Sequence, residues 1–163
     1  MAVIDETIDV NVPLRTAYNQ WTQFEDFPRF MEGVEEVHQL DATTLEWRAK
    51  VGGVEKTWRA KVLDQVPDNR VTWASISGAR NDGMVSFSAL DSGATRVNLR
   101  LDVEPESPLE SAGVALGILG GRVRGDLERF RAFIESKGVE TGAWRSAVTD
   151  GQPTPTAGAR ADR

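Results

Sequence analysis

Short segments in which apolar and polar residues alternate, separated by turn sequences, fill most of the chain from residue 34 to residue 103. In residues 45–51, for example, Leu45, Trp47 and Ala49 alternate with charged residues, and the glycine pair Gly52-Gly53 follows. A period of two residues is typical of a β-strand that buries one face, and a glycine pair favours a hairpin turn. About six consecutive segments of this kind predict an antiparallel meander, whose single apolar face needs a cover.

The segments on either side of this meander supply a further strand and the cover. Residues 3–12 alternate like a strand, and Pro13 then fits the first turn of a helix with one apolar stripe. Pro28 interrupts the aromatic segment FEDFPRFMEGV, which predicts two short helical pieces around a break. Apolar residues that step by three and four from Leu109 to Ile134 predict a helix of about 30 residues, stopped by Gly138.

These elements predict an α+β fold with one domain over residues 1–137, in which the long C-terminal helix covers a curved antiparallel sheet of about seven strands. The segment SGARNDG, residues 77–83, predicts a longer connection between two of these strands. Residues 138–163 are small, polar and proline-containing, so we expect a disordered tail. Trp144 is the one aromatic residue of this tail, and is either a bystander or a contact for a partner.

Composition excludes several classes of function. The formal net charge of −6 disfavours general binding to nucleic acid phosphates. The absence of cysteine excludes disulfides and thiolate metal sites, and the single histidine, His38, excludes a site with two histidine ligands. The N-terminus has no secretory-signal pattern, and no segment reaches the roughly 20 apolar residues of a membrane span. We therefore expect a cytoplasmic protein without stable membrane insertion, metal or cofactor.

Two longer stretches carry a resemblance to a known superfamily. VPLRTAYNQWTQFEDFPRFMEGVEEV (residues 12–37) and WASISGARNDGMVSFSALDSGATRVNLRLDVEP (residues 73–105) resemble signatures of the SRPBCC or START-like superfamily. Within it, they are similar to the polyketide cyclase/dehydrase and coenzyme Q-binding branch. The resemblance implies the helix-grip fold, in which a curved sheet wraps one long helix and leaves an apolar cavity between them. It implies no single activity, since the superfamily includes lipid carriers, cyclases and hydrolase-like enzymes.

Glycine recurs at every fourth residue of the long helix, at Gly113, Gly117, Gly121 and Gly125, with Gly120 added. Glycine inside a helix costs about 1 kcal/mol relative to alanine, so this stripe needs an explanation. Three interpretations stay open. The stripe faces a ligand cavity, it lets a second backbone approach closely, as in a homodimer, or the helix bends there to follow the sheet.

Aromatic residues on the expected inner face indicate what such a cavity would hold. Trp47, Trp58 and Trp73 share one face of the sheet, and tryptophan offers a flat apolar surface with one N–H donor. We therefore expect a flat, ring-containing guest, with the segment FEDFPRFM and the loop SGARNDG as gates. The expected cavity lining is Tyr18, Phe27, Phe30, Met31, Trp47, Trp58, Trp73, Ser75, Phe87, Leu116, Gly117, Gly120 and Gly121, with Arg80 and Asn81 in the gate loop.

No catalytic constellation stands out in the sequence. Cyclisation of a polyketide needs a polar group that orients an enolate and a proton donor or acceptor near it. Tyr18, Ser75, Lys56 and His38 are candidates, but each is more readily explained as a structural or solvated side chain. The sequence therefore leans against an enzyme and assigns no catalytic residue.

The leading functional prediction is binding or carriage of an apolar, ring-containing small molecule, such as a lipid, a quinone or a polyketide. One alternative is a polyketide aromatase/cyclase or dehydratase, which predicts an ionisable pair inside the cavity. The other is a protein-interaction module that docks a partner through the glycine-marked helix, which predicts a filled core and an exposed apolar strip.

Overall fold

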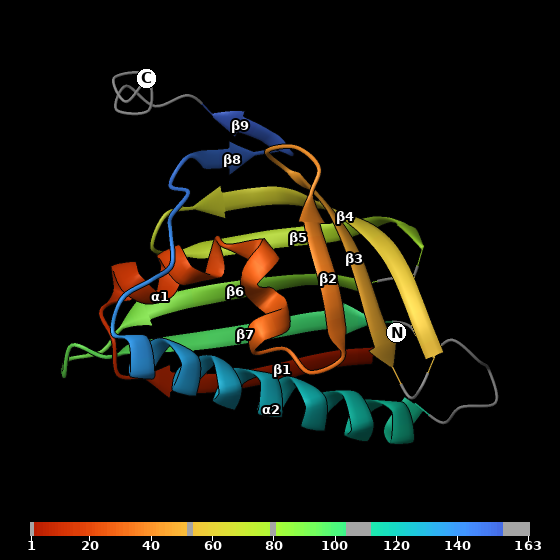
Figure 1. The fold of residues 1–163 in the computed structure, drawn as a ribbon, viewed down its shortest axis with the longest axis horizontal. Coiled ribbons are helices and arrows are strands. Elements are labelled where there is room, and N and C mark those ends of the chain that lie inside the picture. The colour runs from red at the N-terminus through yellow and green to blue at the C-terminus, as the bar shows by residue number, and fades with distance from the viewer. Residues whose placement is uncertain (1, 52–53, 79–80, 104–111, 155–163) are drawn as a thin grey trace.

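The strands form one antiparallel sheet that curves into a trough (Figure 1). The computed structural model describes residues 2–51, 54–78, 81–103 and 112–154. The main strands are β1 (Ala2–Val10), β2 (Val34–Gln39), β3 (Thr44–Val51), β4 (Val54–Val66), β5 (Arg70–Gly78), β6 (Asn81–Ala89) and β7 (Thr95–Val103). Their order across the sheet is β1-β7-β6-β5-β4-β3-β2, so every neighbour from β2 to β7 is also a neighbour in sequence. The predicted meander of about six strands, β2 to β7, is confirmed within a sheet of seven main strands.

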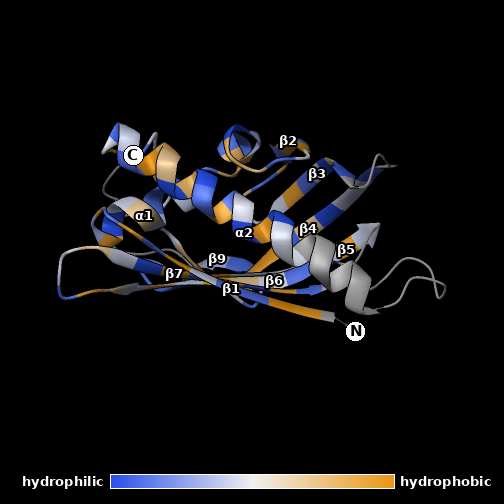
Figure 2. Ribbon diagram, turned by 90° about the horizontal axis from the view of Figure 1, so that it is seen from below, coloured by the Kyte–Doolittle hydropathy of each residue, from blue (hydrophilic) through white to orange (hydrophobic). Residues whose placement is uncertain are grey.

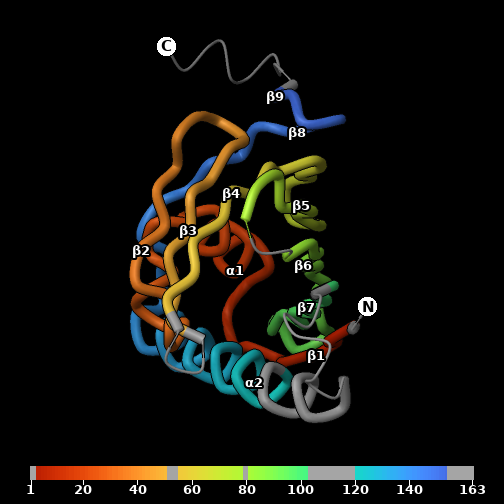
Figure 3. Tube along the Cα trace, turned by 90° about the vertical axis from the view of Figure 1, so that its right-hand side faces the viewer, coloured from red at the N-terminus to blue at the C-terminus, as the bar shows by residue number. Residues whose placement is uncertain are grey.

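Three helical segments lie on the concave side. The helix α1 (Leu14–Trp21) and the 3₁₀ helix η1 (Phe24–Arg29), which contains Pro28, are the two expected short pieces. The long helix α2 (Ala112–Lys137) runs alongside β1, where it makes most of its contacts with the sheet (Figures 1 and 3). It ends as predicted at Gly138, which adopts a positive φ of 71° and donates its N–H to the Ile134 carbonyl. This arrangement is the helix-grip fold.

Irregular pairing bends the middle of the sheet. The 13-residue strand β4 pairs with β3 on one side and β5 on the other, and its register with β5 shifts between Arg59 and Ala60 and again between Val62 and Asp64. Bulges of this kind increase local twist and bend a strand. Viewed from the side in Figure 3, β2–β4 therefore stand opposite β6 and β7, with α2 along the open side.

The core between these layers follows the alternation that the sequence shows (Figure 2). The buried apolar side chains on the described part of α2 are Val123, Leu127, Phe130 and Ile134, all members of the predicted apolar stripe. Phe130 packs edge-on against Trp21 and Phe30, with ring centroids 5.0 and 5.2 Å apart. The C-terminal half of α2 is thus held by a dense aromatic cluster near α1 and η1.

Two expectations about connections and the tail are wrong. The loop SGARNDG is not a long connection, because β5 continues to Gly78 and β6 begins at Asn81. Residues 139–154, expected to be disordered, pack against the domain and form β8 (Ala147–Thr149) and β9 (Gln152–Thr154). Val148 of β8 is 1% exposed and pairs with Gln65 of β4. The remaining part of the expected tail, residues 155–163, lies outside the described residues, as do Gly52-Gly53.

Side-chain hydrogen bonds explain why this polar C-terminal segment (residues 139–154) is ordered. The buried Gln20 donates to the Thr141 hydroxyl and accepts from the Thr141 N–H at 2.9 Å. Arg145 donates to Asn19 and to Asp68, and its guanidinium lies 5.5 Å from the centre of the Tyr18 ring. Buried amides need such partners, so the segment satisfies groups that α1 leaves open. Trp144 is partly buried against the core.

Tyr18, the only tyrosine, gives a spectroscopic test of this packing. It is 0% exposed, and its hydroxyl has no hydrogen-bond partner among the described residues. Burial raises the pKa of Tyr18 to about 12, although the neighbouring Gln65 amide and Arg145 oppose the shift. The folded protein should therefore show no phenolate absorbance near pH 10, where the protein unfolded in guanidinium chloride titrates.

Because the pKa of Tyr18 is higher in the folded than in the unfolded protein, its contribution to the unfolding free energy is complete below pH 10 and is lost as pH rises toward 12. Two pKa units amount to about 3 kcal/mol of unfolding free energy. The variant Tyr18→Phe should lack this part of the fall in unfolding free energy at alkaline pH. Comparison with the wild type therefore separates the effect of Tyr18 from that of lysine titration. A phenolate step near the ordinary pKa in the folded protein would contradict the burial.

Candidate functional site

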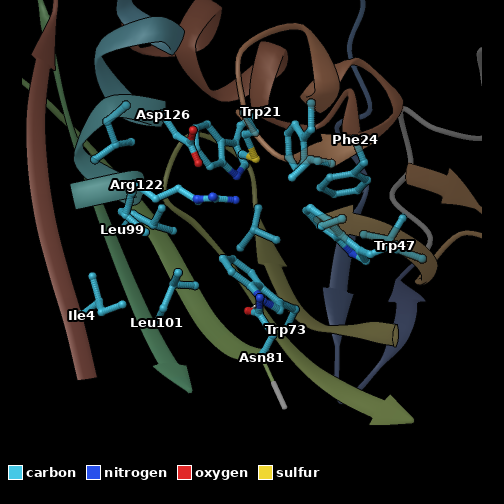
Figure 4. Close-up of a pocket in the computed structure, with 18 of the residues that line it drawn as sticks. Ile4, Trp21, Phe24, Trp47, Trp73, Asn81, Leu99, Leu101, Arg122 and Asp126 are labelled. Carbon is cyan, nitrogen blue, oxygen red and sulfur yellow. Dashed lines mark hydrogen bonds between the residues drawn. The ribbon is translucent and has the colours of Figure 1, made fainter. Parts of the chain in front are cut away.

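A cavity of about 150 Å³ lies between the concave face of the sheet and α2 (Figure 4). Cavities of about this volume with apolar walls stay dry and hold a molecule the size of benzene. The apolar wall consists of Ile4, Trp21, Phe24, Phe27, Met31, Val34, Leu45, Trp47, Ala49, Trp58, Val62, Val71, Trp73, Leu99, Leu101, Val123 and Leu127. The remaining lining residues are Glu32, Asn81, Arg122 and Asp126. The interaction-module alternative required a filled core, and the core is not filled.

Pairing in the sheet fixes the orientation of the three tryptophans. Trp47 and Trp58 are direct partners in the β3–β4 register, and their rings stack with centroids 5.6 Å apart and planes at 9°. Trp73 is paired with Gly83 of β6, and a Cβ at Gly83 would lie only 2.6 Å from the Trp73 ring. The absence of a side chain at Gly83 thus lets the Trp73 ring lie flat over β6. Its indole N–H reaches the Asn81 Oδ1 at 3.4 Å.

The structure places some of the expected lining residues in the wall and others in the packed core. Phe27, Met31, Trp47, Trp58, Trp73 and Asn81 line the cavity. Tyr18, Phe30 and Phe87 are not in the lining, and their buried rings pack against other aromatic rings. These three share the inner face of their elements but lie toward the α1 end, where the aromatic cluster fills the space.

The remaining expected site residues lie outside the wall. The Ser75 hydroxyl bonds to the Asp82 carboxylate and the Asn81 N–H, which ties β5 to β6. Gly120 and Gly121 are absent from the lining, and Gly121 is solvent-exposed with no atom within 4 Å of an added Cβ. Gly120 and Gly121 of α2 therefore do not line the cavity. Arg80, the side chain of Leu116 and the surroundings of Gly117 lie outside the described part of the chain.

The other polar candidates are not in the cavity lining. His38 is 57% exposed and pairs with Glu36 at 3.6 Å on the surface. Lys56 is not part of the cavity lining. Among the residues that the structure describes, no three His, Asp or Glu side chains are grouped closely enough to hold a metal ion. No helix in the same part of the chain combines the length and apolarity that crossing a membrane requires.

Asp126 brings a carboxyl group into the apolar wall. Its side chain is 13% exposed, and its Oδ1 accepts hydrogen bonds from the Glu32 N–H at 2.9 Å and from Arg129. Burial raises the pKa of Asp126, and the bonds from Arg129 and Glu32 only partly oppose that shift. The carboxyl group is therefore poised to take a proton more readily than an ordinary aspartate.

Arg122 extends from α2 across the cavity toward the sheet (Figure 4). Its Nη1 donates to the Lys50 carbonyl at 2.8 Å and to the Glu32 carbonyl at 3.4 Å. Gly33, next to Glu32, has a positive φ of 88°, and a Cβ there would overlap the Arg122 guanidinium. Arg122 thus bridges α2 to the end of β3, through a space that only glycine leaves open.

Sequence reasoning missed both Arg122 and Asp126. They lie four residues apart, on one face of α2, but in a stretch with several other charged residues that are exposed. The only sequence signal is their phase, since each lies one residue before a member of the buried stripe, Val123 or Leu127. An ionisable pair inside the cavity is the feature that the enzyme alternative predicts.

Similar proteins share this fold. A protein from Mycobacterium smegmatis described as a START superfamily protein superposes with a TM-score of 0.76 and 14% identity, over 84% of this chain and 99% of that one. The Zhui aromatase/cyclase from Streptomyces sp. R1128 superposes with a TM-score of 0.71 and 14% identity, over 87% and 98%. An uncharacterized 17.2 kDa protein of Streptomyces lincolnensis is 48% identical over 149 residues, covering 91% of this chain and 99% of its own.

The fold and the cavity define a helix-grip protein with an internal apolar site. Residues 10–131 match the model of the family described as polyketide cyclase/dehydrase and lipid transport. The chain belongs to this family, as the resemblance predicted.

Replacement of Gly33 tests the bridge made by Arg122. Gly33→Ala imposes strain at positive φ and displaces a charged hydrogen-bond donor, so we expect a loss of about 2–4 kcal/mol of unfolding free energy in urea. Gly93→Ala is the matched control, because Gly93 has a φ of 87° and no atom within 4 Å of an added Cβ. It should lose only about 1–2 kcal/mol. Equal losses in the two variants would show that the bridge adds nothing.

Proposed function

We propose that this protein binds and carries an apolar, ring-containing small molecule in the cavity between the sheet and α2. The observation that carries the proposal is the unfilled apolar space of about 150 Å³. Apolar surface removed from water contributes about 25 cal/mol per Å². A single ring of about 150 Å² would thus gain roughly 4 kcal/mol, which corresponds to binding in the millimolar range for the ring alone.

The shape of the wall favours a flat ring. The stacked pair Trp47–Trp58 and the flat-lying Trp73 provide planar surfaces on the sheet side of the cavity. A larger lipid, quinone or polyketide would place one ring there and extend through the cavity mouth. The proposal includes a cytoplasmic location, which is consistent with a sequence free of cysteine. A homodimer through α2 stays a prediction.

Native mass spectrometry of the freshly purified protein, followed by solvent extraction, would identify a bound natural guest. Toluene is the defined probe, because it matches the cavity in size and has no polar group. Its binding can be followed by tryptophan fluorescence and by calorimetry.

Filling the cavity should abolish toluene binding. Ala49 lies in the wall and is 3% exposed, so Ala49→Leu should lower toluene affinity at least about tenfold and change the unfolding free energy by less than about 1.5 kcal/mol. Ala60→Leu is the control, since Ala60 is 0% exposed but not in the wall. It should cost about 1–3 kcal/mol by overpacking and leave toluene affinity unchanged. Undiminished binding by Ala49→Leu would place the probe elsewhere.

Asp126 favours a second candidate function, a cyclase or dehydratase that acts on a poly-β-ketone. A carboxyl group with a raised pKa in an apolar wall is suited to donating and accepting protons. The Zhui neighbour is described as an aromatase/cyclase, although at 14% identity that likeness shows only the fold.

Replacement of Asp126 separates carriage from catalysis. If the protein is a cyclase, Asp126→Asn should reduce the turnover of a poly-β-ketone substrate by about 100-fold or more, while toluene affinity stays within about twofold. The ring absorbance of the product is the readout, and Glu128→Gln, on the exposed face of α2, is the matched control. Absence of turnover by the wild-type protein with retained toluene binding would support carriage alone.

A further inference from the structure

The charges at the cavity are unevenly compensated. Arg129 pairs with both carboxylates of the lining, since it donates to Asp126 and lies 3.4 Å from the Glu32 carboxylate. Arg124, on the outer face of α2, pairs with Glu6 at 3.1 Å. Arg122 donates hydrogen bonds only to main-chain carbonyls, and in the part of the chain that the structure describes no carboxylate lies within ion-pair distance of it. The Asp126 carboxylate feels the Arg122 charge, which is the weakest of the influences that lower its pKa.

Arg122 also has unused donors. A guanidinium carries five N–H groups, and both hydrogen bonds of Arg122 come from Nη1. Within the described residues, Nε and Nη2 contact no acceptor. The side chain is half-buried and lines the cavity, so a cation with unused donors and without a direct ion pair among the described residues is available at the boundary between the apolar wall and solvent.

We propose that Arg122 recognises an anionic oxygen group on the guest, so that the ligand class is an apolar ring bearing a carboxylate or a comparable acidic oxygen. This inference rests on the proposed function and specifies its ligand. The ring lies against the tryptophans, and the acidic group receives paired N–H donors from the guanidinium. Asn81 lies elsewhere in the wall, where its Oδ1 accepts from the Trp73 indole N–H, and its neutral amide offers an anion no charge.

The alternative is that Arg122 serves only to tie α2 to the end of β3. A structural tie predicts that a neutral ring and an acidic ring bind equally well. Recognition predicts a preference for the acid, because charge-assisted hydrogen bonds are stronger than neutral ones. Three probes with the same ring separate these cases, namely toluene, benzamide and benzoate.

The experiment is calorimetric titration of the full chain at neutral pH. The wild-type protein should bind benzoate at least about fivefold more tightly than benzamide. Arg122→Gln should reduce this ratio to about one, and because both probes carry the same ring, the ratio does not depend on any change in toluene affinity. Arg122→Lys, which keeps the charge, should retain part of the ratio. Arg124→Gln is the matched control on the same helix, and should behave as the wild type.

The outcomes distinguish the two proposals. If toluene binds but the benzoate-to-benzamide ratio is the same in wild type and Arg122→Gln, Arg122 is a structural tie and the inference is overturned. If neither toluene nor benzoate binds the wild-type protein, the cavity is not a ligand site and the proposed function fails with it. Far-UV circular dichroism and the thermal midpoint show whether Arg122→Gln is folded. If it is not, the ratio measured on a folded Arg122→Lys that still binds toluene decides. A ratio below the wild-type value supports recognition by Arg122, and the full wild-type ratio overturns it.

Discussion

The packing of one helix against a strongly curved sheet governs the rest of this structure. At its C-terminal half, α2 reaches the aromatic cluster of α1 and η1 through Phe130 and Ile134, both 0% exposed. Farther toward its N-terminus, Arg122 crosses to the end of β3, and the wall between helix and sheet encloses a space rather than a packed interior. A single helix of ordinary diameter cannot fill a trough bent by the bulges of β4, so a cavity results.

Much of the fold could be predicted from the sequence because its signals are local. A period of two residues identified the strands, and Gly138 marked the end of α2 through its positive φ. The family resemblance gave the topology. The same signals were insufficient for the site, because periodicity tells which face a residue occupies but not how far along the trough it lies. Tyr18 and Phe87 are on the correct face but at the end that side chains fill, where their rings are 5.5 Å apart.

The features that could not be predicted depend on partners distant in sequence. Arg122 and Asp126 look like solvated charges until the loop at Glu32 and Gly33 is brought against α2. The C-terminal segment looks disordered by composition, but Gln20 and Asn19 are buried amides on α1 that need partners, and Thr141 and Arg145 supply them. In both cases a polar residue is ordered by a hydrogen bond across about 100 residues or more, which no local pattern records.

These two sets of polar contacts make the two ends of the trough chemically different. The C-terminal segment covers the α1 end, where Thr22 accepts from the Trp144 N–H and the interior is filled with aromatic rings. At the cavity itself the polar groups are instead only partly buried and belong to Arg122, Asp126 and the loop before β2. The cavity would therefore match a guest with one apolar end and one acidic end. Its aromatic surface would face the apolar end, and the cation near solvent would face the acidic end. Under the proposed function, burial of the ring would supply the affinity, and pairing of the acidic group with Arg122 would avoid the cost of burying an unpaired ion.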